Sequence, residues 1–490
     1  MPEGNGRAVP LRRWLARRDR ARWALGLMLV VWSTTFIVLG WMRHDRFSTY
    51  GFDLGIYDQA TWLLSQFEGQ LITVRGLNVF GHHVSPVLYL FAPFYWLGAG
   101  PQFLLIAQVL AQGSGAVAIY LLARDRLESR WLGVGLAAVL LLNPTYQFLA
   151  WEFFHPETLA IGPLLFAYWA ARARRWGWFW AAAALAISCK EDIALALVVI
   201  GVLIALRGDR RIGAMAAFLA SAWYLLATRV VIPGFNYGIP PFYEGYFGEF
   251  GDSAGAVARS VTGRPGRTFR ALTRNDRLDY FLAMVGPFGL LPLFALPSFA
   301  VALPMLAINA LSTFPYTRDI KYHYSALVVA GAAVATVEAI SWMGQGDRAR
   351  RTLVGLVMVT ALASSVAWGP SPIGREFRGP IWPLKEPPGQ EARERAVAMI
   401  PPGAATSAFY NLVPHLAHRR LIYEFPTPFV AGLWGVRGER LPDPGIVRWL
   451  VVDRGQMGAQ DQSVLDGLLV QEFATRFSRD GILVAERVAR

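Results

Sequence analysis

Charged and histidine side chains gather in a few short segments of an otherwise apolar sequence. These segments hold Asp53 and Asp58, His82 and His83, Glu152, His155 and Glu157, Lys190, Glu191 and Asp192, and Lys321, His323 and Tyr324. Four of the seven histidines fall among them. A carboxylate can accept a proton from a hydroxyl group, and ammonium or imidazole groups can stabilise a departing anion. The residue types therefore suit acid–base chemistry on a substrate with an anionic leaving group.

Each segment also has a purely structural interpretation. Asp53 alone could cap an interfacial helix, and His82 and His83 could belong to a solvated loop. His155 precedes a proline that suits the first turn of a helix, and 190–192 could be a turn whose charges neutralise each other. All these interpretations would have to hold together to explain the set, which favours a common site.

The elements that must position these segments are membrane spans. Of the 490 residues, 54% are hydrophobic and 17% are charged, a balance that excludes a disordered chain, collagen and a coiled coil. Residues 23–41 and 131–151 are uncharged runs of 19 and 21 residues, close to the ~20 that cross a bilayer. We predict a polytopic α-helical membrane protein with about eleven transmembrane helices. They are 23–41, 100–122, 131–150, 157–171, 176–190, 193–206, 212–231, 281–296, 298–313, 324–343 and 352–369.

The basic residues predict the orientation of these spans in the cell membrane. The formal charge is +13, and only three of the 47 basic residues are lysines. The arginines cluster at the ends of apolar runs, which argues against nucleic-acid binding and for the positive-inside rule. With a cytoplasmic N-terminus, the cytoplasmic segments hold 19 basic residues against six in the short outer loops. Only the arginine-rich 259–277 disagrees, and long loops escape the rule.

The predicted topology brings the polar segments to one side of the membrane. The first, third, fifth and ninth spans all end on the extracytoplasmic side, and a polar segment follows each of them. Charged groups inside a membrane cost a few kcal/mol and are usually functional. We therefore expect these helix ends, together with His82 and His83, to line one polar cavity at the outer surface.

The composition changes after about residue 370. A proline-rich stretch at 379–390 precedes charged residues at the density of a soluble protein. Alternating helix and strand patterns between 391 and 488 predict a small α/β domain. The predicted organisation is a cytoplasmic basic tail (1–22), a transmembrane domain (23–369) and an extracytoplasmic α/β domain (370–490). The single cysteine, Cys189, excludes an intrachain disulfide.

The polar segments resemble a known family. Phe52-Asp53-Leu54-Gly55-Ile56-Tyr57-Asp58-Gln59, Phe154-His155-Pro156-Glu157, Lys190-Glu191-Asp192 and the C-terminal Pro414-His415-Leu416-Ala417-His418 are similar to the predicted-membrane-protein family called domain of unknown function 2079. That family is grouped with the C-type glycosyltransferases, integral membrane enzymes that use polyprenyl-phosphate-linked sugars and carry an acid just after the first span.

The resemblance implies a function and roles for the residues. Asp53 or Asp58 takes the place of the first-loop acid and accepts a proton from the acceptor, a glycan or a protein, with inversion at the anomeric carbon. Lys190, Lys321 and the histidines are candidates to bind the donor phosphate. A divalent cation on Asp53, Asp58 and His83 is chemically reasonable, but the spacing specifies no metal.

Two other functions also place charges in a membrane cavity. A lipid or glycolipid transporter or flippase would bury them near the midplane, often within repeated halves, and no internal repeat is visible here. A non-catalytic cell-envelope assembly protein would bind its partners through the C-terminal domain. The gathering of polar segments at one surface favours the transferase.

Overall fold

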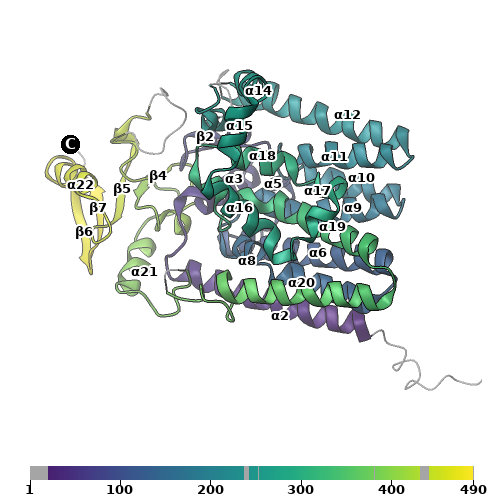
Figure 1. The fold of residues 1–490 in the computed structure, drawn as a ribbon. Helices are drawn as coiled ribbons and strands as arrows, with labels where there is room; N and C mark the ends of the chain where they lie inside the picture. The colour runs from purple at the N-terminus through teal and green to yellow at the C-terminus, as the bar shows by residue number, and fades with distance from the viewer. Residues whose placement is uncertain (1–19, 237–241, 252, 380, 431–440, 489–490) are drawn as a thin grey trace, which may run out of the picture.

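The computed structural model describes residues 20–236, 242–251, 253–379, 381–430 and 441–488 (Figure 1). Most of the predicted cytoplasmic tail, residues 1–19, lies outside the described residues. The described chain forms a bundle of helices with a small mixed sheet against one end of it (Figure 1).

Among the described residues, five helices are long and apolar enough to cross a membrane. They are α2 (Arg20–Asp45), α6 (Pro101–Leu127), α12 with its continuation (Arg210–Phe235), the helix His323–Met343 that contains α19 (Ala326–Met343), and α20 (Asp347–Trp368). A bent pair, α7 (Arg130–Leu142) and α8 (Pro144–Trp151), makes a sixth if it is counted as one span. The prediction of a helical, multi-span membrane protein is confirmed at this level, whereas the count of eleven is not.

Prolines and short lengths account for the difference in the number of spans. The predicted span 131–150 is bent by 56° where Asn143 caps the helix that begins at Pro144. Three further apolar helices have 12 to 17 residues: α9 (Pro156–Arg172), α10 (Trp176–Ile187) and α11 (Ile193–Leu206). The predicted spans 281–296 and 298–313 become α16 (Asn275–Val285), two short 3₁₀ turns, α17 (Leu296–Phe299) and α18 (Leu303–Leu311). Prolines start these short pieces because a proline lacks the N–H that would continue a helix.

The C-terminal unit, residues 390–488, forms a five-stranded sheet with the order β4-β3-β5-β7-β6. Its elements are α21 (Gln390–Ala398), β3 (Thr406–Ala408), β4 (Ile422–Glu424), β5 (Trp449–Asp453), α22 (Ala459–Gln471), β6 (Phe473–Arg479) and β7 (Ile482–Arg487). Strand β3 is parallel to β4 and β5, and β7 is antiparallel to β5 and β6. The predicted strands and hairpin match this sheet. The predicted helix 411–418 does not, because only the turn η8 (Val413–His415) forms around Pro414.

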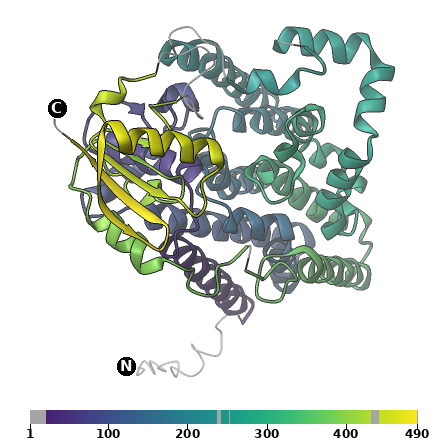
Figure 2. The ribbon, with the colours of Figure 1, turned by 90° about the vertical axis from the view of Figure 1, so that its left-hand side faces the viewer.

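The C-terminal unit lies across the helix ends that carry the polar segments. Figure 2 shows its yellow strands in front of the purple and blue helices, with the teal helices to one side. Turn η8 packs on the segment η1 (Gly51–Gly55), which follows α2. The amide of Gly51 donates a hydrogen bond to the carbonyl of Tyr410, at 2.6 Å. The first loop of the membrane bundle is therefore held in place by contacts with the C-terminal unit.

Candidate functional site

Asp53, in the segment that follows the first helix, has a strained backbone conformation. Its φ is 74° and its ψ is −86°, a combination that costs a residue with a side chain about 1–3 kcal/mol and is frequent at functional sites. The glycines at both ends of η1, Gly51 and Gly55, leave room for Val413 of the C-terminal unit, which would stand 2.9 and 3.1 Å from a Cβ at these positions. One carboxylate oxygen of Asp53 lies 3.2 Å from Nε2 of His155, and 27% of the side chain is exposed. Asp53 is therefore both held and accessible.

The C-terminal unit supports this segment from the other side. Glu424, on β4, lies so close to Gly51 that a Cβ on this glycine would stand 2.7 Å from the Glu424 carboxylate. The same Cβ would stand 2.9 Å from Cβ of Val413. Burial raises the pKa of Glu424 to about 7. The Asp53 segment is thus confined between the bundle and a buried acid of the C-terminal unit.

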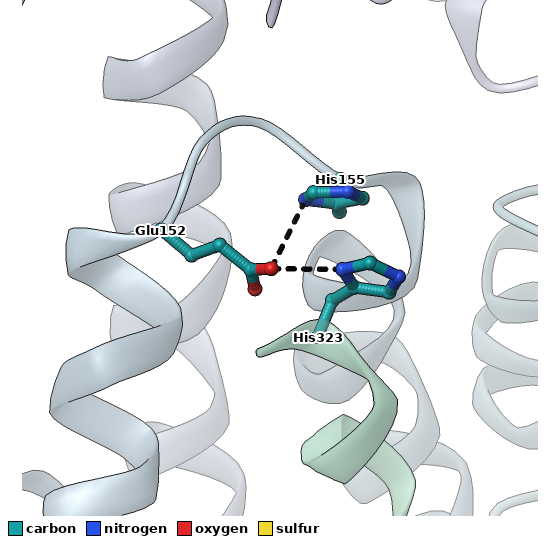
Figure 3. Close-up of side chains that lie close together, drawn as sticks. All are labelled: Glu152, His155 and His323. Carbon is teal, nitrogen blue, oxygen red and sulfur yellow. Dashed lines mark hydrogen bonds and ion pairs between the residues drawn. The ribbon is translucent and has the colours of Figure 1, made fainter. Parts of the chain in front are cut away.

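His155 connects Asp53 to a second acid and a second histidine. Figure 3 shows Glu152, His155 and His323 meeting from α8, the start of α9 and the start of the α19 helix. Glu152 Oε1 lies 2.9 Å from Nδ1 of His323 and 3.9 Å from Nδ1 of His155. The two imidazole rings are stacked, with their centroids 3.6 Å apart.

The carboxylates around His155 decide its charge. Burial alone would lower the pKa of His155, but Asp53 and Glu152 outweigh it and raise the pKa to about 9. Burial raises the pKa of Glu152 well above its ordinary value. At neutral pH His155 is therefore an imidazolium, and it donates through Nε2 to Asp53 and through Nδ1 to the Phe153 carbonyl at 2.9 Å.

The network continues from His323 to a buried lysine. His323 Nε2 lies 3.7 Å from Glu157 Oε1, and this carboxylate accepts a hydrogen bond from the ammonium of Lys190. Asp192 lies 3.3 Å from the same ammonium. Burial would lower the pKa of Lys190, but Asp192 and Glu157 raise it, so the lysine stays charged. Burial raises the pKa of Asp192 to about 6 against the effect of Lys190.

His83 and Glu191 form the next pair of this network. His83 Nδ1 lies 2.8 Å from Glu191 Oε1, and the Val84 amide donates to Glu191 Oε2 at 3.0 Å. The ring of His82 lies 4.5 Å from that of His83 and 6.0 Å from that of Tyr57, which also faces His155. Segments that are far apart in the sequence are thus joined, as the topology predicted.

A cavity of about 400 Å³ adjoins this network. Its polar wall includes His83, Lys190, Asp192, His323 and Tyr324. The rest is largely apolar and comes from α14 (Ala254–Gly263), α18 and the continuation of α12, with side chains such as Val261, Met305 and Leu311. A cavity with one charged end and apolar walls suits an amphiphilic ligand with a charged head.

Two of the predicted site residues, Asp58 and Lys321, have their contacts outside this network. The carboxylate of Asp58 is fully buried and interacts with the hydroxyl of Tyr95 and with His418 of the C-terminal unit. The ammonium of Lys321 lies 5.8 Å from the ring centroid of Phe148. The five-residue spacing turns Asp53 and Asp58 toward different partners, so the two carboxylates make separate sets of contacts.

The sequence analysis gave no site role to Arg229 or to His418, although His418 belongs to the C-terminal motif. Arg229 lines the cavity from within an apolar helix, and a charge inside such a run is a sign of function that could have been noticed. His418 follows Asp58 by 360 residues. No local pattern could have paired them.

The residues that could hold a metal differ from those expected. Glu152, His155 and His323 each offer a ligand atom, and these atoms lie within 4.8 Å of one another. A metal ion lies in the plane of an imidazole that binds it, and two rings stacked at 3.6 Å cannot both meet this condition for one ion. The arrangement as it stands favours proton transfer and charge pairing over metal binding.

Comparison with known families decides where this protein belongs. The model of the family described as "Predicted membrane protein (DUF2079)" matches residues 43–466. The chain belongs to the DUF2079 family. The resemblance noted in the sequence is therefore confirmed. A separate comparison of the chain with curated proteins found no match.

Solved structures show the fold of this DUF2079 protein. The crystal structure of ArnT from Cupriavidus metallidurans bound to undecaprenyl phosphate is similar, with a TM-score of 0.53 and 16% identity over 94% of this chain and 98% of that chain. The apo structure of the same ArnT gives a TM-score of 0.53 and 17% identity over 98% of both chains. The DUF2079 protein thus shares its architecture with ArnT along nearly the whole chain.

Proposed function

We propose that this DUF2079 protein is a C-type glycosyltransferase that moves a sugar from a polyprenyl-phosphate donor to a hydroxyl group at the extracytoplasmic surface. The observation that carries the proposal is the pairing of Asp53 with the His155 imidazolium beside a cavity with one charged end. The shared fold supports it, since the similar ArnT structure holds undecaprenyl phosphate.

Asp53 is the residue best suited to act as the base. Its carboxylate is partly exposed and held by one imidazolium, whereas Asp58 is fully buried. In the proposed step Asp53 takes the proton of the acceptor hydroxyl while the hydroxyl oxygen attacks the anomeric carbon. The bond from this carbon to the phosphate oxygen breaks, its electron pair stays on the lipid phosphate, and the anomeric centre inverts.

The cavity supplies the binding of the donor. Lys190 is a permanent cation at its polar end and suits the phosphate as a point charge. Arg229 adds a second positive charge to the wall. The apolar walls suit the first isoprenoid units, because apolar surface removed from water contributes about 25 cal/mol per Å². The donor would enter from the lipid phase with its phosphate toward Lys190.

The test compares Asp53→Asn with a matched control, Asp209→Asn, whose carboxylate pairs with Arg174 on the surface. Both proteins are placed in vesicles, and mass spectrometry of the co-purified lipid identifies the donor. Transfer of isotope-labelled sugar should fall at least about 100-fold in Asp53→Asn, as expected for loss of a general base. The control should keep its activity and both variants should bind the lipid.

Other outcomes would reject the proposal. Unchanged transfer in Asp53→Asn would remove this residue as the base. Lipid movement across the bilayer without any sugar transfer in the unaltered protein would assign the site to a flippase instead.

A further inference from the structure

A second polar pocket, separate from the donor cavity, lies between the bundle and the C-terminal unit. Its volume is about 240 Å³, and its polar walls come from His44 and Gln102 of the bundle and His415, His418 and Arg419 of the C-terminal unit. It shares no lining residue with the donor cavity. The sequence motif around Pro414 that the proposed reaction does not use thus forms a pocket of its own.

Asp58 fixes one wall of this pocket. Its buried carboxylate accepts a hydrogen bond from the Tyr95 hydroxyl at 2.7 Å and lies 3.2 Å from Nε2 of His418. His418 stacks on Trp62, and 39% of its side chain is exposed. Burial would lower the pKa of His418, but Asp58 raises it. Since Nε2 faces Asp58, Nδ1 is the polar atom of His418 that remains for a ligand.

His415 offers the complementary group. Its ring is held between His44 and Phe47, with centroids 4.1 Å and 4.0 Å away. Burial lowers the pKa of His415 to about 4, so the ring is neutral, and it bonds the backbone of His44. Its Nε2 is buried and has no hydrogen-bond partner among the residues described. A neutral imidazole has one donor and one acceptor nitrogen, so His415 keeps hydrogen-bonding capacity at Nε2 that the described residues do not use.

The charge of the walls selects the chemistry of the ligand. The positive charge of His418 is balanced by Asp58, and His415 is neutral. The Arg419 guanidinium is 6% exposed as a residue and donates to the Leu416 and Ala404 carbonyls and to Thr406. Arg419 carries the charge that these groups leave unbalanced, but its Nε and Nη1 donate to protein oxygens rather than to the pocket, which disfavours a phosphate. Two adjacent hydroxyl groups of one ligand would supply both the partner that Nε2 of His415 lacks among the described residues and an acceptor for His418.

We propose that this pocket binds a single neutral sugar ring, with His418 and His415 as its polar contacts and Asp58 as the residue that positions His418. At ~30 Å³ per water molecule the pocket has room for about eight waters, the scale of one such ring. Its use as the acceptor site rests on the proposed function, since the pocket lies beside helix α3 (Ile56–Ser65), which directly follows the Asp53 segment. The binding of sugar itself does not depend on that reaction.

The experiment measures binding without turnover. Saturation-transfer NMR on the full-length protein in nanodiscs uses methyl glycosides of glucose, mannose, galactose and N-acetylglucosamine, with inorganic phosphate as the anionic probe. At least one glycoside should bind saturably. His418→Ala should weaken it about tenfold or more, the loss expected for one hydrogen bond to a charged group, and His415→Ala about fivefold, the loss expected for a neutral one. Arg420→Ala, an exposed neighbour paired with Glu68, should leave binding unchanged.

The outcomes separate this proposal from the proposed function. Asp53→Asn should bind the glycoside normally although it fails in transfer. Binding of a glycoside by a protein that transfers no sugar would leave the pocket assignment standing and reject the transferase. The assignment is overturned if no glycoside binds, if phosphate alone binds, or if folded His418→Ala and His415→Ala bind the glycoside as the unaltered protein does. Thermal unfolding of each variant shows that it is folded.

Discussion

Two buried clusters of charge lie at different levels of the bundle, and they differ in how completely their charges are paired. In the first, Glu338 on α19 accepts hydrogen bonds from Arg172 Nε at 2.6 Å and Arg126 Nε at 3.0 Å, and both its oxygens are used. Tyr168 adds a contact at 3.4 Å. Such a closed arrangement joins α6, α9 and α19 and leaves nothing for a ligand.

The second cluster, around Asp53 and Lys190, is left incomplete. His323 of this cluster lies about 15 residues before Glu338 on the same helix, a separation of roughly 22 Å at 1.5 Å per residue. Glu152 Oε2, Glu157 Oε2 and Asp192 Oδ1 are buried without hydrogen-bond partners among the described residues. A cavity adjoins this cluster. Unused bonding capacity next to a cavity, rather than buried charge as such, distinguishes the candidate site from the rest of this bundle.

The strongest test of this difference between the two clusters is to neutralise one acid in each. Glu338→Gln leaves two arginines without a counter-charge and should lower the free energy of unfolding by about 2–3 kcal/mol. Transfer per folded molecule should stay the same. Glu157→Gln should have the opposite pattern and lower sugar transfer. The free energy of unfolding should change less, because Lys190 still pairs with Asp192. Thermal unfolding and transfer assays check both, and equal effects in the two variants would contradict the distinction.

A smaller change tests whether the functional cluster depends on the C-terminal unit. Gly51→Ala places a methyl group against Glu424 and Val413 and should cost about 1–3 kcal/mol, as overpacking does. It should also reduce transfer, because the Asp53 segment must shift. Gly69→Ala is the control, since nothing lies within 4 Å of the added Cβ. Normal transfer in Gly51→Ala would show that the contact does not position Asp53.

The pH dependence of stability sharpens the comparison further. His155 has its pKa raised from 6.5 to about 9, so its stabilisation is complete below about pH 6.5 and is lost as the pH rises through 9. Glu424, raised from 4.5 to about 7, stabilises as a neutral acid and loses this contribution as the pH rises from 4.5 through 7. At 1.4 kcal/mol per pKa unit, each step is at most about 3.5 kcal/mol. In thermal unfolding between pH 4 and 10, Glu424→Gln should remove the lower step and His155→Gln the upper one.

The smallest effect is expected from removing metal ions. Because the stacked rings of His155 and His323 cannot bind one ion together, chelation with EDTA should change transfer less than about twofold, whereas loss of a catalytic metal would cost several kcal/mol. Restoration of lost activity by one divalent cation would instead make Glu152, His155 and His323 a metal site.

The sequence predicted the meeting of the polar segments better than their detailed roles. The arginine distribution and the apolar runs correctly joined the 152–157, 190–192 and 318–324 segments, because helices that end on one side of a membrane must share a surface. The contact of Asp58 with His418 could not be predicted, because His418 lies 360 residues away in the chain. The region 281–313 was misjudged because its apolar residues pack as short proline-led pieces, which hydropathy alone does not distinguish from spans.

The hydrogen bond from Gly51 to Tyr410 has a consequence for biosynthesis. Domains generally fold in order as the chain emerges from the ribosome, yet the loop after the first helix cannot reach its final form until residue 410 has been made and delivered to it. The loop that carries Asp53 would thus take its final form only when the last part of the chain closes over it.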